Sequence, residues 1–254
     1  MDALLSLKDV SVQFAGLSAL QDVSFDARAG EVRAIIGPNG AGKTTLFNAV
    51  SGYVPTTHGE IHFKGEPIHG LAPHEVSMMG VRRTFQNGGL FPEMTVLENI
   101  MAGLHVQIES SVLGLVLGLR GAREAEREGL ARARRLLDLM DLGATADQPV
   151  KDLSGGQQRM VEIVRTLATE PPLLLLDEPF VGLAPPMRDR MMQITRRLAG
   201  EEGIGILLIE HVIDLVMAGS DVIVVLNSGR LIAEGPPDEI RQNREVLEAY
   251  LGFA

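Results

Sequence analysis

The sequence contains no cysteine, which excludes disulfide bonds, thiolate metal sites and cysteine nucleophiles. It also lacks a long apolar run, because the longest, residues 112–119, falls far short of the ~18 to 20 residues that cross a bilayer. Residues 1–14 contain no basic segment, no continuous apolar core and no small-residue cleavage site, so no secretion signal is expected. Cationic residues number 23 against 33 acidic ones, which argues against a basic nucleic-acid groove spread over the surface. We therefore expect a soluble protein that binds no nucleic acid and meets a membrane only through partners.

Apolar residues make up 45% of the 254 positions, which is enough for a sizeable core. This length favours one α/β unit that carries an insertion. Partly alternating apolar and polar residues, separated by glycine-containing turns, predict short strands at residues 5–14, 19–25, 31–36 and 60–63. We interpret these four segments as a small, largely antiparallel β region.

Unbroken apolar runs characterise the C-terminal part of the chain. Residues 173–176, 205–209 and 221–226 are typical of strands that are buried on both faces of a parallel sheet. Helical spacing at residues 187–198 and 212–217 separates them, and such alternation of strand and helix predicts a doubly wound α/β core. The middle of the chain has helical spacing instead, with an apolar stripe at Leu130, Ala133, Leu136, Leu137 and Met140.

A glycine-rich segment follows the strand predicted at residues 32–36 and opens a helix at residues 44–51. It matches the pattern GxxxxGK[ST]. Its glycines let successive backbone N–H groups turn inward and form an anion cradle at a helix N-terminus. Lys43 adds a charge at the β and γ phosphates, and the Thr44 hydroxyl is an oxygen ligand suited to Mg²⁺. The predicted phosphate-binding residues are Gly37, Pro38, Asn39, Gly40, Ala41, Gly42, Lys43, Thr44 and Thr45.

Two adjacent carboxylates, Asp177 and Glu178, follow the apolar residues 173–176. They stand at the C-terminal end of the predicted strand, where α/β sheets place their ligands. Alone, such a pair can be a simple strand-end turn, but together with a phosphate loop it indicates catalysis. We expect Asp177 to hold Mg²⁺, in most such proteins through water, and Glu178 to act as the general base on the attacking water.

The residues LSGGQ at 153–157 open a helix predicted at residues 158–169. Ser154, Gly155 and Gly156 form a second helix-start anion site, and Gln157 completes the motif. As a bare pentapeptide the segment could be only a helix cap and loop. Its position shortly before the two carboxylates makes it highly specific, and it separates this chain from kinases and small GTPases.

With these motifs in this order, the chain resembles the nucleotide-binding subunit of an ABC transporter over almost its whole length. The resemblance implies that Phe14 stacks on adenine; otherwise Phe14 is a strand-end core residue. It implies that Gln86 reaches the Mg²⁺ and attacking-water region and connects the core to the helical insertion. It also implies that His211 contacts the γ-phosphate and supports Glu178. The predicted catalytic residues are thus Glu178, His211 and Gln86, the metal site is Thr44, Gln86 and Asp177, and the cofactors are ATP and Mg²⁺.

The expected fold class is α/β, with a P-loop (RecA-like) core around a parallel sheet, an N-terminal antiparallel β subdomain and an inserted α-helical subdomain. We expect the whole chain, 1–254, to form one nucleotide-binding domain. The β subdomain and core occupy about 1–87 and 166–254, and the helical subdomain occupies about 88–165.

The resemblance further implies a mechanism and partners. Two cassettes face head to tail, so that each ATP lies between one phosphate loop and the Ser154–Gln157 segment of the other copy. Partners are then a second ATPase, identical or related, two transmembrane permease subunits and an extracytoplasmic solute-binding protein. The chain would lie peripherally at the cytoplasmic face of the cell (inner) membrane. One residue departs from the family pattern, because Ala184 stands where many members keep an aspartate that makes polar contacts across the dimer.

Finer features resemble the ATPase of a branched-chain amino-acid uptake system. They are RTFQN at 83–87, LF at 90–91, MTVLEN at 94–99, IEH at 209–211 and AYLG at 249–252. Closely similar subunits serve urea or other small amides and acids. A soluble ABC ATPase of translation or DNA repair is a further alternative, although such proteins usually carry two cassettes, a long coiled coil or basic extensions. Import is inferred from the resemblance alone.

Overall fold

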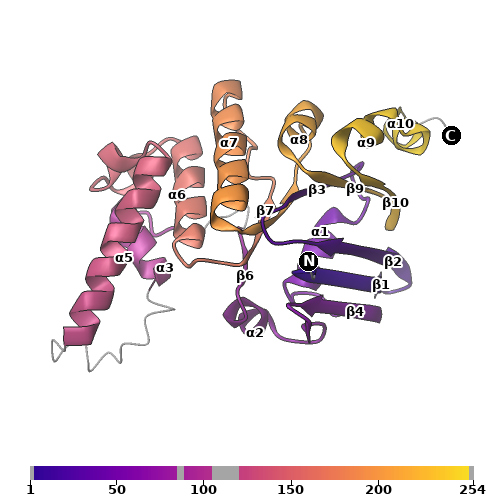
Figure 1. Cartoon of the computed structure of the whole chain (residues 1–254), viewed down its shortest axis with the longest axis horizontal. Coiled ribbons are helices and arrows are strands. Elements are labelled where there is room, and N and C mark those ends of the chain that lie inside the picture. The colour runs from indigo at the N-terminus through magenta and orange to yellow at the C-terminus, as the bar shows by residue number, and fades with distance from the viewer. Residues whose placement is uncertain (1–2, 85–88, 105–119, 252–254) are drawn as a thin grey trace. The chain divides into compact units, whose positions relative to one another are not determined.

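The computed structural model describes residues 3–84, 89–104 and 120–251, which divide into two compact units (Figure 1). One unit combines Met1–Arg83 with Pro172–Ala254, and the other is Thr84–Pro171. The chain therefore leaves the first unit, forms the second and returns to the first.

A six-stranded sheet lies at the centre of the first unit. Its strands are β3 (Val32–Ile36), β6 (Val81–Arg83), β7 (Leu173–Asp177), β8 (Gly205–Ile209), β9 (Val222–Asn227) and β10 (Arg230–Gly235). Their order is β10-β9-β3-β8-β7-β6, and all neighbours run parallel except β10, which is antiparallel to β9. Every residue of β3, β7 and β8 is buried, as expected of strands covered on both faces.

Helices cover both faces of this sheet. They are α1 (Lys43–Val50), α2 (Pro73–Met78), α7 (Pro185–Glu202), α8 (Ile213–Gly219), α9 (Pro237–Gln242) and α10 (Arg244–Leu251). Because side chains alternate along a strand, β3 contributes to two cores. Ile35 belongs to the core that contains Phe47 of α1, whereas Ala34 and Ile36 belong to the core that contains Val216 of α8. In Figure 1 the helices α8, α9 and α10 accordingly lie on the face opposite to α1.

A second sheet in the same unit is fully antiparallel. It contains β1 (Leu5–Phe14), β2 (Leu17–Ala27), β4 (His58–Phe63) and β5 (Glu66–Pro67), in the order β2-β1-β4-β5. The prediction that residues 31–36 join this antiparallel region is wrong, because β3 lies between β9 and β8 in the parallel sheet. Arg33 made the segment look alternating, but its guanidinium is buried and pairs with Glu31, 2.7 Å away, and with Glu234 of β10.

The second unit is helical. It contains α3 (Val96–Leu104), α5 (Arg120–Leu139), α6 (Gly155–Leu167) and two short 3₁₀ turns, Gly143–Thr145 and Val150–Asp152. The three helices pack on one another. Of the predicted stripe, Ala133, Leu136, Leu137 and Met140 are buried, whereas Leu130 is half-buried. The predicted fold class is therefore confirmed. Within the described ranges, no helix is both long enough and apolar enough to cross a membrane.

Candidate functional site

The phosphate loop connects β3 to α1, and its glycines take conformations that other residues rarely adopt. The φ angles of Gly37, Gly40 and Gly42 are 149°, 79° and 103°. A Cβ at Gly37 would stand 2.1 Å from the carbonyl oxygen of Leu226, and one at Gly42 would stand 2.7 Å from that of Ala19. At these two glycines the loop therefore packs directly against the backbone of β9 and β2, with no room for a side chain. Gly42 is also the N-cap of α1 and no side chain caps this helix, so its first N–H groups suit a bound anion.

The buried Lys43 turns its ammonium group back into this loop. Nζ donates hydrogen bonds to the carbonyl oxygens of Gly37, at 2.7 Å, and Pro38, at 3.0 Å. Desolvation lowers the pKa of Lys43, whereas the charge of Glu178 acts in the opposite direction. A buried cation is stabilised by additional negative charge, so the arrangement suits a phosphate group. Because β3 and β7 both pair with β8 in parallel, the phosphate loop after β3 and Glu178 after β7 stand at the same edge of the sheet.

Asp177 ends β7 and is buried. Its Oδ2 accepts a hydrogen bond from Nη2 of Arg83 at 2.7 Å. Nη1 of Arg83 donates to Oδ1 of Asn48 at 2.7 Å and to Oγ of Ser51 at 3.1 Å. The guanidinium carbon also lies 5.6 Å from the ring centre of Phe47. Arg83 therefore joins β6 and the carboxylate of β7 to helix α1, a function that the sequence motifs did not reveal.

The residues present fit a magnesium ion that arrives with the nucleotide. Thr44 is exposed on the first turn of α1, and Asp177 supplies a carboxylate, which are the oxygen donors that Mg²⁺ prefers. Among the described residues no group of three or more His, Cys, Asp or Glu could form a complete metal cage. Mg²⁺ is usually bound by one or two carboxylates together with substrate phosphates, and this donor set matches that coordination. Gln86, the third predicted metal ligand, lies outside the described residues.

Glu178 and His211 meet at the ends of two neighbouring strands. Oε1 of Glu178 lies 2.7 Å from Nε2 of His211. Glu178 has a left-handed backbone, with φ of 49°, and such strain in a non-glycine residue is common at functional sites. The side chains are 24% and 41% exposed, so both remain accessible to a reacting group. A carboxylate paired with an imidazole in this way can orient and deprotonate a water molecule.

The remaining predicted nucleotide contacts are Phe14 and the motif at residues 154–157, and they lie in different units. Phe14 is 46% exposed at the end of β1, so the alternative that it is a core residue is wrong, and its stacking on adenine stays a prediction. The motif residues Ser154, Gly155, Gly156 and Gln157 begin α6 in the second unit.

Ser154 and Gln157 cap that helix reciprocally. Oγ of Ser154 accepts from the Gln157 N–H at 3.3 Å, and Oε1 of Gln157 accepts from the Ser154 N–H at 3.0 Å. Ser154 and Gly155 are exposed, and a Cβ built at Gly155 would meet no atom within 4 Å. The helix start is therefore open to a partner or ligand.

Ala184 is the N-cap residue of α7, and Pro185 follows it directly. Its backbone is extended, as at other N-caps, but no side chain caps this helix. The departure from the family pattern thus coincides with an uncapped helix start.

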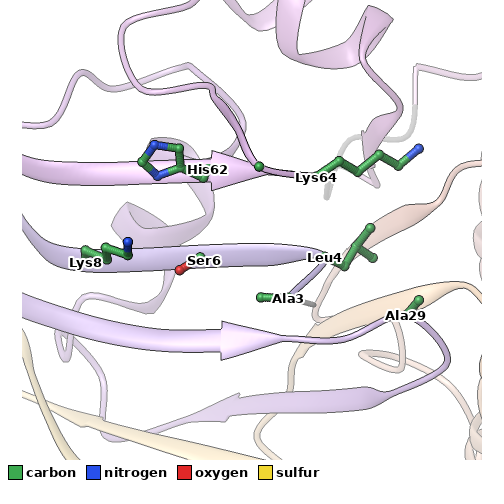
Figure 2. A pocket seen from close by; sticks show the side chains of 8 residues that line it. Ala3, Leu4, Ser6, Lys8, Ala29, His62 and Lys64 are labelled. Atoms are coloured by element: carbon green, nitrogen blue, oxygen red, sulfur yellow. The ribbon is translucent and has the colours of Figure 1, made fainter. Parts of the chain in front are cut away.

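A separate cavity lies on the antiparallel sheet (Figure 2). Its side chains come largely from β1 and β4 and from the segments next to them, and its lining residues are Ala3, Leu4, Ser6, Lys8, Ala29, His62, Lys64 and Gly65. None of them belongs to the predicted nucleotide site, and no carboxylate lines this cavity. The predicted nucleotide site therefore does not coincide with this cavity.

Comparisons with known proteins identify the family to which the sequence is similar. A family model described as ABC transporter matches residues 20–181, and a second, described as branched-chain amino acid ATP-binding cassette transporter, matches residues 230–252. The high-affinity branched-chain amino acid transport ATP-binding protein BraF of Pseudomonas aeruginosa is 40% identical over 251 residues, which are 99% of this chain and 98% of that protein.

Solved structures show the same similarity. The ADP conformation of an ATP-binding cassette of an ABC transporter has a TM-score of 0.85 and 32% identity, and covers 99% of this chain and 100% of that one. A bacterial ABC transporter cassette solved as a dimer has a TM-score of 0.77 and 27% identity, and covers 92% of this chain and 98% of that one.

Proposed function

Because this chain belongs to the ABC transporter family and is one of its ATP-binding, ATP-hydrolysing subunits, we propose that it powers the import of branched-chain amino acids. The observation that carries the catalytic part is the 2.7 Å contact of Oε1 of Glu178 with Nε2 of His211, at the same sheet edge as the phosphate loop. A phosphate-binding cation and a water-activating carboxylate are thus present in one unit.

In this proposal each residue has a defined task. The backbone N–H groups of residues 37–45 and the ammonium of Lys43 bind the phosphates, and Phe14 stacks on the base. Glu178 accepts the proton of the attacking water, while His211 orients Glu178 and contacts the γ-phosphate. Mg²⁺, held by Thr44 and Asp177 with Gln86, would neutralise charge on the phosphate oxygens. Positioning and electrostatics provide most of the catalysis of such phosphoryl transfer.

The transported solute is proposed from two observations. The 40% identical relative is named for branched-chain amino acid transport, and a family model with the same solute matches residues 230–252. These support branched-chain amino acids over urea or other small solutes. The cassette itself does not touch the solute, so the similarity of the whole system carries this part.

The working assembly is proposed to contain a second ATPase subunit, two permease subunits and an extracytoplasmic solute-binding protein. A similar cassette has been solved as a dimer, which supports pairing of two cassettes. The exposed start of α6 supports a role for Ser154 in sealing the ATP of the other copy. We place the chain peripherally, at the cytoplasmic face of the inner membrane.

Phosphate release by the purified chain tests the catalytic assignment. Glu178→Gln is expected to lower turnover by about 10² to 10⁴-fold, the usual contribution of a general base, while ATP still binds. Near-normal turnover in this variant would contradict the role of Glu178. For the solute, the chain is reconstituted in vesicles with its permeases and binding protein. Leucine, isoleucine and valine should stimulate ATP turnover, whereas stimulation by urea alone would favour the other assignment.

A further inference from the structure

Glu210 is the buried acidic residue of the IEH segment at 209–211, and the resemblance assigns it no task. It follows β8 directly and precedes His211, and it is only 2% exposed. A buried carboxylate is costly unless hydrogen bonds satisfy it, so its partners indicate what it does.

The partners of Glu210 are backbone N–H groups from two different loops. Its Oε1 accepts a hydrogen bond from the N–H of Phe180 at 3.0 Å. Its Oε2 accepts from the N–H of His211 at 2.9 Å, and the N–H of Val212 lies 3.4 Å from the same oxygen. Phe180 belongs to the loop after β7, whereas His211 and Val212 follow β8. One carboxylate therefore connects the loop that carries Glu178 to the loop that carries His211.

The connection matters because the backbone of Glu178 is strained. Its φ of 49° lies in the left-handed region, which L-residues occupy only when the surroundings enforce it. The N–H of Glu178 donates to the carbonyl oxygen of Ile209 at 3.0 Å, and two residues later Phe180 is held by Glu210. The end of β8 thus fixes the strained turn at two points, on either side of the Glu178 side chain.

We propose that Glu210 is a positioning residue that holds the loops of Glu178 and His211 so that their side chains meet. It touches neither the nucleotide nor the reacting water in this role, because its carboxylate is buried and engaged with the backbone. The consequence for hydrolysis rests on the proposed function, whereas the consequence for the Glu178–His211 contact does not. A shift of ~1 Å in a catalytic group can cost ~10²-fold in rate, so a modest movement of either loop is sufficient.

The variant that tests this is Glu210→Gln, which keeps the shape and one acceptor oxygen but turns an NH₂ group toward backbone donors. The control is the same acid-to-amide change at the exposed Asp221, Asp221→Asn. Oδ2 of Asp221 also accepts from a backbone N–H, that of Val32 at 2.9 Å, but at the opposite end of the parallel strands. For each protein we would measure kcat and KM for ATP, the melting temperature and the ¹⁵N signal of the His211 imidazole. If Glu210→Gln fails to fold, the same measurements are made on Glu210→Asp.

Glu210→Gln is expected to lower kcat about tenfold or more, with KM for ATP changed less than about twofold. In a Glu178→Gln background it should cause no further loss, and in the single variant the imidazole signal should move toward that of Glu178→Gln. Asp221→Asn, whose amide oxygen can still accept from the Val32 N–H, should leave kcat unchanged. An unchanged kcat and imidazole signal in Glu210→Gln would overturn the proposal, as would an equal loss of kcat in Asp221→Asn.

The imidazole signal separates this inference from the proposed function. If the wild-type chain hydrolysed no ATP, the proposed function would fail, and the signal alone would decide the role of Glu210. If the His211 imidazole signal of Glu210→Gln equals that of the wild type, the inference is rejected. If it moves as it does in Glu178→Gln, the inference is supported.

Discussion

The guanidinium of Arg83 and the carboxylate of Asp177 form an ion pair of 2.7 Å in which both side chains are 6% exposed. The pair joins the last residue of β6 to the last residue of β7. Arg83 belongs to the RTFQN segment that resembles branched-chain amino-acid ATPases, so the structure gives this arginine a physical role.

Replacing Arg83 by methionine leaves the charge of Asp177 in the protein interior without this counter-ion. Removal of one partner of a buried pair typically costs about 3 to 5 kcal/mol of unfolding free energy, which urea denaturation would measure. Arg82→Met is the matched control on the same strand, because Arg82 is only half-buried and hydrogen-bonds Ser77. We expect it to cost about 1 kcal/mol. Equal losses in the two variants would contradict the importance of the ion pair.

The cap of α6 offers a comparison within the second unit. Ser154 and Gln157 form one capping box, and Thr95 and Glu98 form another at α3, where the Glu98 N–H donates to Oγ1 of Thr95 at 3.2 Å. Ser154→Ala and Thr95→Ala should each lower the unfolding free energy by about 1 kcal/mol. Only Ser154→Ala should also weaken dimer formation by the ATP-bound Glu178→Gln protein, as followed by light scattering. If Thr95→Ala weakened the dimer equally, Ser154 would act through stability alone.

A serine at position 184 should stabilise the chain. Ala184 already has the extended backbone of an N-cap, and the Met187 N–H, which donates to the Ala184 carbonyl oxygen at 2.9 Å, lies within reach of a hydroxyl there. A new N-cap adds about 0.5 to 2 kcal/mol, so Ala184→Ser should raise the urea midpoint. Ala184→Val, which has no acceptor, should not raise it. Equal midpoints for the two variants would show that the N–H groups of α7 need no side-chain cap.

The lowered pKa of Lys43 predicts how stability depends on pH. Because folding lowers this pKa below its ordinary value of 10.5, the unfolded chain binds more protons between the lowered value and 10.5. The unfolding free energy of the wild type, relative to Lys43→Met, should therefore rise with pH across that window. A relative stability that falls with pH there would show that the folded state holds the proton more tightly. Calorimetry on the same variant should show loss of ATP binding at neutral pH.

Local patterns were sufficient for the parts of the site that adjacent residues define. The spacing of Gly37, Gly42 and Lys43 predicts a loop between strand and helix, and the structure has it between β3 and α1. The apolar run before Asp177 likewise predicts a buried strand that ends at a carboxylate. In both cases a single segment contains all the necessary information.

Interactions between distant residues were beyond such patterns. Arg33 looked like the polar position of an alternating strand, because its partner Glu234 follows 201 residues later. The partner of Arg83 lies 94 residues away, and Phe180 lies 30 residues before the glutamate that binds it. A charged side chain in an apolar strand reveals its role only when the neighbouring strands are known, which explains the wrong sheet assignment of residues 31–36.

The central place of β3 has a consequence for the newly made chain. The glycine motif is made well before the strands that flank it, because β3 pairs with β8 and β9, and Val32 binds Asp221, which is synthesised 189 residues later. The backbone of Leu226 that packs against Gly37 is made later still. A nascent chain that ends before β9 therefore contains the whole glycine motif but lacks the strands that pack against the loop. Nucleotide can therefore stabilise this protein only after β8 and β9 have been made and have paired with β3.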